Sequence, residues 1–220
     1  MNFNTKLKLF KFIQKILKYF NLKIFYSKDV NFLNYISRVE NIIDVGVENG
    51  TKFLYKNFPK AKYYLIEANP IFYDYLENKF LKKYNGKLFK IAAGKKKSKK
   101  YFFLSGPISS FYKREDFHFK KRKKVDLVPL DIILNKEKIN SNTILKVDCE
   151  GGELDVLLGA KGILKKVNYV IIELRLQKIN TYNPSEIISF LYNFNFKWRQ
   201  ILKVYYAKNG IDYIDILFTK

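Results

Sequence analysis

Hydrophobic and polar positions alternate along the middle of the chain between short apolar runs and longer stretches with a helical repeat. The apolar runs predict buried strands at 41–46, 62–67, 87–92, 143–148 and 168–174. The stretches between and after them predict helices at 51–58, 70–83, 152–164 and 184–193. Alternation of this kind is typical of parallel strands joined by crossover helices, so we expect an α/β fold with a doubly wound sheet.

The end of the chain follows another pattern. Two runs rich in Ile, Val, Phe and Tyr flank Asn209-Gly210, a dipeptide that favours a tight hairpin turn. We therefore expect a mostly parallel sheet that ends in an antiparallel C-terminal strand pair. No internal repeat or linker interrupts residues 41–220, which predicts one domain over this range.

Residues 1–40 form a separate N-terminal segment in this interpretation. Read as a helix, residues 6–26 carry lysines on one side and apolar residues on the other, which predicts a basic amphipathic helix. Docking on the domain, attachment to an anionic membrane surface and docking on a partner all remain open for it. Lysines interrupt any signal-peptide core, and no apolar run is long enough to span a bilayer. With a single cysteine, Cys149, the sequence suggests a cytoplasmic protein, with peripheral attachment at the inner face of the membrane as an open addition.

The chain is strongly basic. Lys and Arg total 42 against 20 Asp and Glu, which gives a formal net charge of +22. Such a charge favours anionic partners, but most of it is lysine in a chain also rich in Asn, Ile, Phe and Tyr, as AT-rich codon usage produces. Functional selection and compositional drift therefore both remain open. Basic tracts at 95–100 and 119–124 flank an aromatic stretch, which we interpret as a short strand or hairpin followed by a long loop on the substrate side.

The turn after the first strand carries the first candidate site. Asp44 ends the strand, and Gly46, Glu48 and Gly50 follow it, while Glu67 closes the second strand. In dinucleotide-binding folds a glycine-rich turn approaches a pyrophosphate and an acidic residue binds the ribose. Here two carboxylates would repel a pyrophosphate but attract a cation. S-adenosylmethionine is cationic, has a ribose diol for Glu67 and contains no phosphate, so it fits this turn better than a nicotinamide cofactor; a plain strand-to-helix turn with a capping acid is the alternative.

A second group of motifs points to a family. The stretch "ILKVDCEGGELDVLLGAKGIL", with "NYVIIEL" after it and "IDVGVENG", "IEANP", "AAG" and "LDIIL" before it, resembles the FkbM family of S-adenosylmethionine-dependent methyltransferases over residues 41–174. Two departures are Val47-Glu48, where the family typically has Ala-Asn, and Cys149, where it has Val. The resemblance implies a Rossmann-like class I methyltransferase that uses S-adenosyl-L-methionine, with O-methylation of a hydroxyl on a saccharide or related metabolite.

The resemblance also implies roles for individual residues. Asp44 and Gly46 would hold the methionyl end of the cofactor, with Glu48 and Gly50 in the same loop. Glu67 would bind the ribose, with Asn69 beside it. The adenine would lie near Ala92 and Ala93. Asp148 and Glu150 would lie nearest the transferable methyl, as acceptor-orienting groups or general base, with Asp148 also counted among the cofactor-binding residues.

Other interpretations of these residues stay open. Glu150 and Glu153 could serve the positive end of the following helix, and a divalent ion could bind Asp148 and Glu150, although no third ligand is evident from the spacing, so we expect no metal. His118, the only histidine, is a candidate base or a solvated loop residue. Cys149 lies between two carboxylates and is expected to pack rather than react. Ser109, Ser110 and Glu173 are further candidates for the acceptor pocket.

Two rival functions use the same fold. The basic tracts suggest a nucleic-acid methyltransferase or binding module, although no base-gripping motif of the Asn/Asp-Pro-Pro-Tyr kind is present. The basic helix suggests a non-catalytic membrane-surface protein. Our preferred partner is a small-molecule or glycan acceptor, with nucleic acid less favoured.

Overall fold

The computed structural model describes Thr5 and residues 32–104, 109–111, 121–176, 181–207 and 210–220. The predicted helix at 6–26, His118 and Asn209 lie outside these residues. By internal contacts the chain divides into two units, Met1–Asn31 and Phe32–Lys220, and the second contains nearly everything described here. None of the described helices is both long and apolar enough to cross a membrane.

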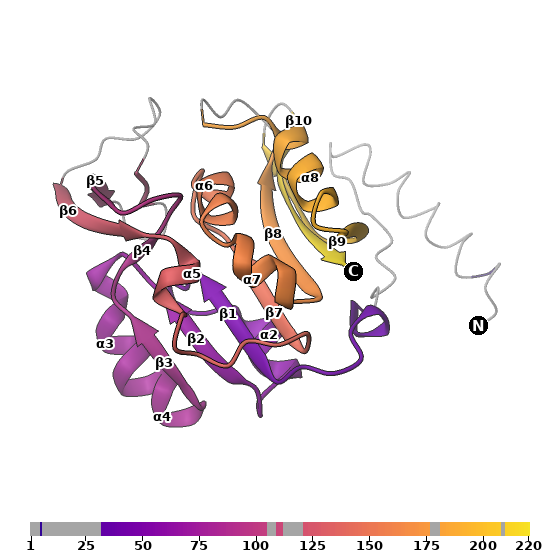
Figure 1. Cartoon of the computed structure of the whole chain (residues 1–220), viewed down its shortest axis with the longest axis horizontal. Coiled ribbons are helices and arrows are strands. Elements are labelled where there is room, and N and C mark those ends of the chain that lie inside the picture. Colours follow the sequence, from indigo (N-terminus) through magenta and orange to yellow (C-terminus); the bar gives the residue numbers. More distant parts are fainter. Residues whose placement is uncertain (1–4, 6–31, 105–108, 112–120, 177–180, 208–209) are drawn as a thin grey trace. The chain divides into compact units, whose positions relative to one another are not determined.

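A seven-stranded sheet forms the centre of this unit, in the order β3-β2-β1-β7-β8-β10-β9 (Figure 1). The parallel strands are β1 (Asn41–Val45), β2 (Lys62–Ile66), β3 (Gly86–Phe89), β7 (Thr143–Val147) and β8 (Tyr169–Arg175). The hairpin of β9 (Lys197–Ala207) and β10 (Gly210–Thr219) adds two strands, with β10 antiparallel to both β8 and β9. The expected α/β architecture with an antiparallel C-terminal pair is confirmed.

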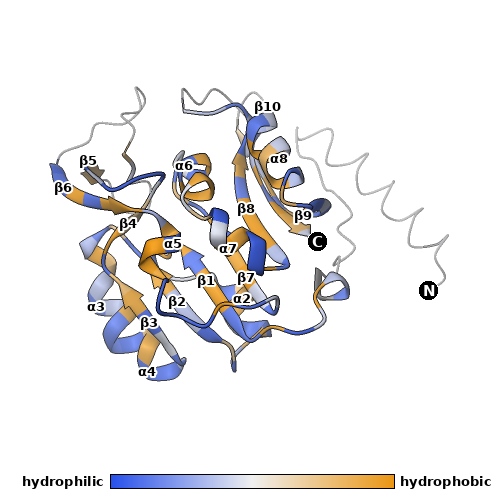
Figure 2. Cartoon of the chain, in the orientation of Figure 1, coloured by the Kyte–Doolittle hydropathy of each residue, from blue (hydrophilic) through white to orange (hydrophobic). Residues whose placement is uncertain are grey.

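Helices cover both faces of the sheet. One face packs against α5 (Leu130–Ile133), α6 (Glu153–Leu158), α7 (Lys161–Lys166) and α8 (Pro184–Tyr192), and the other against α2 (Lys52–Asn57) and the helical turns of residues 70–83. Neighbouring β1 residues serve opposite cores, Ile42 on the α2 side and Ile43 on the α5–α8 side. Strands buried on both faces read as the continuous apolar runs seen in the sequence (Figure 2).

Two predicted helices differ in detail. Residues 70–83 are helical but change type, from a 3₁₀ turn at Pro70–Phe72 through α3 (Tyr73–Tyr75) and a π turn at Leu76–Phe80 to α4 (Leu81–Lys83). The prediction of one helix over 152–164 was wrong, because α6 ends at Leu158 and α7 begins at Lys161. The two helices are separated at Gly159, where the backbone passes so close to Gly94 that a Cβ would lie 2.1 Å from the Gly94 carbonyl oxygen.

A smaller three-stranded sheet lies beside the first, formed by β4 (Ala92–Ala93), β5 (Ser98–Leu104) and β6 (Lys121–Val128) in the order β4-β6-β5. The predicted strand at 87–92 is divided at Lys90-Ile91, because β3 and β4 belong to different sheets. Residues 121–124 of the second basic tract, which we interpreted as the flank of a loop, begin strand β6. A short bridge between Phe103 and Ser110 extends this sheet beyond β5.

Candidate functional site

The carboxyl ends of β1 and β7 lie side by side, as the doubly wound topology predicts. Val45 pairs with Val147, and the Asp148 backbone N–H donates to the Val45 carbonyl at 3.0 Å. Gly46 follows β1 with a φ of +77°, and a Cβ there would lie only 1.7 Å from the Asp148 carbonyl oxygen. Only glycine therefore allows the first loop to pass so close to the end of β7.

Asp44 is fully buried and is not among the residues that line the cavity described below. Its carboxylate accepts hydrogen bonds from the Tyr55 hydroxyl at 2.7 Å and the Thr51 hydroxyl at 3.0 Å. Gly50 also turns away from the cavity, with φ +92°, and packs against the Tyr55 ring. Asp44 and Gly50 therefore do not line the cavity, and the cofactor contacts expected for them stay predictions. Both residues shape the loop that carries Gly46 and Glu48.

Lys146, a residue to which the sequence gave no role, links the two strand ends. Its Nζ lies 3.1 Å from Asp148 Oδ2, 3.4 Å from Asp44 Oδ1 and 3.4 Å from the Gly46 carbonyl oxygen. Burial lowers the pKa of Lys146, but attraction by Asp148 and Asp44 outweighs it, so the pKa is raised and the lysine stays charged. The sequence signal that could have identified Lys146 is a lysine inside an otherwise apolar strand, two residues before Asp148.

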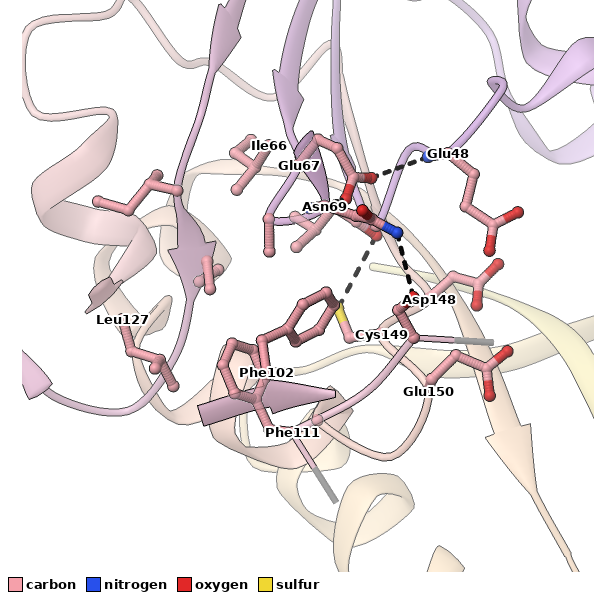
Figure 3. Close-up of a pocket in the computed structure, with 18 of the residues that line it drawn as sticks. Glu48, Ile66, Glu67, Asn69, Phe102, Phe111, Leu127, Asp148, Cys149 and Glu150 are labelled. Carbon is pink, nitrogen blue, oxygen red and sulfur yellow. Dashed lines mark hydrogen bonds between the residues drawn. The ribbon is translucent and has the colours of Figure 1, made fainter. Parts of the chain in front are cut away.

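Glu67 organises the loop after β1 and the turn after β2. Its carboxylate accepts the backbone N–H of Glu48 at 2.9 Å and that of Asn69 at 2.6 Å (Figure 3). Burial raises the pKa of Glu67 against these hydrogen bonds, which lower it. Asn69 caps the turn at Pro70 through Ile71 N–H and donates from its amide to the Ser109 hydroxyl at 3.1 Å. The predicted ribose-binding residues thus lie where the main sheet meets the small sheet.

A cavity opens between these loops and the small sheet (Figure 3). One wall is polar and contains Gly46, Glu48, Glu67, Asn69, Asp148 and Glu150. The other is mainly apolar and contains Ile66, Phe72, Ile91, Ala92, Ala93, Phe102, Phe111 and Leu127. The structure thus brings together most of the predicted site residues, and it adds two aromatic rings, Phe102 and Phe111, 4.7 Å apart, that sequence reasoning missed.

Carboxylates gather at the rim of the polar wall. Oxygens of Asp148, Glu150 and Glu173 all lie within 4.8 Å of one another. Glu173, on β8, is therefore the third carboxylate that spacing could not reveal. Arg175 already supplies a cation here: it pairs with Glu150 and lies 3.8 Å from Glu173 and 3.9 Å from Asp212.

Burial and, after it, repulsion between carboxylates raise the pKa of several groups near this rim. Burial, with repulsion from Asp148, raises the pKa of Glu48 to about 7 and that of Asp215 to about 6. Burial also raises the pKa of Glu173 to about 10, with Asp148 and Glu150 adding to the effect. An additional positive charge at this rim would be stabilised, and perturbed carboxyl groups in a cavity are typical of functional sites.

The residues after Asp148 divide between structural and site roles. Glu153, at the start of α6, accepts the N–H groups of Cys149 and Gly151, so the helix-start interpretation fits Glu153. Glu150 precedes the helix with φ +52° and reaches Arg175 instead. Burial, with repulsion from Glu153, raises the pKa of the Cys149 thiol well above its usual value, in agreement with a packing role.

Comparison with models of known protein families identifies the family of this chain. A family model described as the methyltransferase FkbM domain matches residues 44–198. The chain belongs to the FkbM methyltransferase family. The match covers both loops described above and confirms the resemblance drawn from the sequence.

One solved structure agrees with this FkbM assignment at the level of the fold. A methyltransferase FkbM from Methylobacillus flagellatus KT has a TM-score of 0.50 and 15% identity, over 83% of this chain but only 44% of its own. The present chain thus spans less than half of that protein.

Two other structures carry S-adenosyl-L-methionine. They are fibrillarin from Aeropyrum pernix (TM-score 0.49, 10% identity, 83% of this chain and 67% of its own) and magnesium protoporphyrin IX methyltransferase from Synechocystis PCC 6803 (TM-score 0.48, 7% identity, 83% and 71%). A search of the curated proteins found no significant match.

Proposed function

We propose that this FkbM-family domain binds S-adenosyl-L-methionine and transfers its methyl group to a hydroxyl of a saccharide or related metabolite. The observation that carries the proposal is the cavity at the carboxyl ends of β1, β2 and β7, whose polar wall is lined by carboxylates. Such a wall favours a cationic cofactor over a pyrophosphate. Ligands of doubly wound folds bind at this edge of the sheet.

The cofactor contacts follow from the positions of the side chains. Glu48 and Asp148 flank Gly46 and offer negative charge to the ammonium and sulfonium groups. Glu67 accepts one backbone N–H on each oxygen and keeps acceptor capacity for a ribose hydroxyl. Ala92 lies on the apolar wall with Phe102 and Phe111, which suits the adenine. Asp44 acts through Lys146 and Thr51 as a positioning residue.

Methyl transfer requires alignment and a proton acceptor. The acceptor oxygen attacks the methyl carbon as the carbon–sulfur bond breaks, the sulfonium becomes a neutral thioether, and the hydroxyl proton passes to a base. We assign this base to Asp148 or Glu150, since both line the cavity. Lys146 holds the Asp148 carboxylate and Arg175 holds Glu150, so each is oriented before the acceptor binds. His118, outside the described residues, stays a prediction as an alternative base.

The acceptor class rests on family kinship, and the location of the protein rests on the sequence. A cytoplasmic domain, with residues 6–26 on an anionic membrane surface, remains our proposal for the N-terminal segment. Sedimentation with anionic vesicles, before and after deletion of residues 1–31, tests it. Vesicle binding that is unchanged by the deletion would remove the segment from this role.

Transfer of labelled methyl from S-adenosylmethionine to a panel of saccharides, compared with RNA and DNA, tests the proposed activity. Asp148→Asn should lower the rate by about a hundredfold or more, as loss of a general base does. Asp126→Asn, which removes an exposed carboxylate on β6, is the matched control and should retain the rate. Label that appears in nucleic acid and in no saccharide would favour the rival function.

A further inference from the structure

The small sheet has two faces with different neighbours, and strand register assigns each side chain to one of them. In the antiparallel pair, Phe102 is opposite Lys123, Lys100 is opposite Val125, and Ser98 is opposite Leu127. Directly opposite side chains lie on the same face. We call this the cavity face, since Phe102, Lys100 and Leu127 all line the cavity. Leu104 and Lys121, also a pair, complete it.

The other face, the outer face, carries the remaining residues of the antiparallel pair β5 and β6, which we call the basic hairpin. Lys99 is opposite Asp126 and forms an ion pair with it at 3.4 Å, and Tyr101 is opposite Lys124. The Arg122 guanidinium lies 4.3 Å from the Tyr101 ring centre. These contacts occur between outer-face residues, which supports the assignment.

Lysines continue the cavity face beyond the cavity itself. Lys100 lines the cavity and approaches Asp155 at 3.9 Å. Lys123 is its diagonal neighbour across the strands, about 7 Å away, and Lys121 is two residues further, again about 7 Å. Within the described part of the chain, neither Lys121 nor Lys123 forms an ion pair, and both are exposed. In Figure 2 the far end of β6 is hydrophilic, while its end near β4 is hydrophobic.

Lys121 and Lys123 are not among the residues that line the cavity, so the cofactor proposed for the acidic strand ends leaves these two lysines for another ligand. A ligand that extends from the acidic strand ends toward the hairpin would meet Lys100 and then Lys123 and Lys121. Lysine is a point charge that suits phosphate, and one phosphate ester has enough charge and oxygens to engage two neighbouring lysines.

We propose that the acceptor is a phosphorylated small molecule, whose phosphate ester binds Lys121 and Lys123 on the cavity face while its hydroxyl lies at the carboxylate rim. This inference rests on the proposed function for the location of the methyl group. A nucleic acid is less well matched, because it would exploit the charge of both faces and the outer face neutralises part of its own with Asp126.

Two double variants with equal charge change separate the faces. Lys121→Gln with Lys123→Gln removes two charges from the cavity face, and Lys99→Gln with Lys124→Gln removes two from the outer face of the same hairpin. Binding of inorganic diphosphate and of glucose 1-phosphate is followed by phosphorus NMR at low salt. We expect the cavity-face variant to weaken both about tenfold and the outer-face variant by less than about twofold.

Other outcomes would overturn the proposal. Equal weakening in both variants would mean that phosphate responds only to net charge, and tight binding of a single-stranded oligonucleotide that depends on both faces would identify nucleic acid as the partner. S-adenosylmethionine affinity, measured on the same samples, should be unchanged in both variants. If the wild-type protein does not bind S-adenosylmethionine, the proposed function is contradicted, and the phosphate result is then judged separately.

Discussion

The acidic strand ends and the basic hairpin lie on opposite sides of one cavity, but their charges are held in different ways. Asp44, Glu67 and Lys146 are buried, and each has two or more partners at hydrogen-bond or ion-pair distance. Lys121 and Lys123 are exposed and depend on strand register alone for their direction. A buried charge needs a partner, so the fold determines the position of each of these buried side chains. Exposed lysines need no partner and can accumulate by drift, so only the sheet face that they occupy indicates a function.

The largest effect should follow from removing the buried lysine. Lys146→Met would leave Asp44 as a buried carboxylate without its cation, which should cost about 3–5 kcal/mol of unfolding free energy. Urea unfolding at pH 7 measures it. The matched control, Lys124→Gln, removes an exposed lysine from β6 and should change stability by less than about 0.5 kcal/mol. Similar costs for the two variants would contradict the contrast between the regions.

Gly46→Ala should have the next largest effect. The new Cβ would meet the Asp148 carbonyl and strain a backbone with φ +77°, so the loop and Asp148 must separate. We expect a loss of about 2–3 kcal/mol in stability, and loss of cofactor binding, since strain of this kind costs about 1–3 kcal/mol. Gly210→Ala is the control: its φ is also positive, at +126°, but no atom lies within 4 Å of the new Cβ. Calorimetry would show binding retained only in the control.

Glu173→Gln should stabilise the protein. The pKa of Glu173 is raised to about 10 in the folded state, above the ordinary value of 4.5, so folding favours the protonated form. Stability from this group is fully present below pH 4.5 and is lost as pH rises toward 10. The variant should therefore gain about 1–2 kcal/mol at pH 8 and nothing at pH 4, measured by thermal unfolding, because the neutral amide of Gln can be buried without taking up a proton. A gain that is equal at both pH values would refute this assignment.

The smallest effect concerns the pH dependence of cofactor binding. Glu48, with a pKa raised to about 7, is largely neutral at pH 6 and ionised at pH 8, and only the ionised form attracts a cation. S-adenosylmethionine affinity should rise by about tenfold between pH 5.5 and 8.5, equivalent to about 1.4 kcal/mol. The rise should disappear in Glu48→Gln. A flat profile in the wild-type protein would place the cofactor's positive charge elsewhere.

The sequence predicted the main sheet well, because its strands are buried on both faces and read as uninterrupted apolar runs. It also predicted the cavity residues Glu48, Glu67, Asn69 and Asp148, which lie within three residues of a strand end. It missed strand β6, because Lys121–Lys124 carry no hydrophobic pattern and pair only with distant residues of β5. Spacing along the chain likewise could not show that Glu173 and Arg175 meet Glu150, since β8 contributes them from another strand end.

The expectation for Asp44 shows a further limit. A carboxylate at a strand end, followed by a glycine turn, indicates a ligand site, and the pattern cannot tell a residue that touches the ligand from one that holds its loop. The Asp44 carboxylate accepts hydrogen bonds from the hydroxyls of Tyr55 and Thr51, 11 and 7 residues further along, and so holds the loop. Glu48, at the place where the family usually has Asn, is the loop carboxylate that lines the cavity.

Calorimetric titration with S-adenosylmethionine, with NADH as the comparison, tests the central claim that the carboxylate-lined cavity holds a cationic cofactor. The wild-type protein should bind S-adenosylmethionine in the micromolar range and NADH far more weakly, and Asp148→Asn should weaken the first without creating the second. Absence of S-adenosylmethionine binding, or tighter binding of NADH, would contradict the claim.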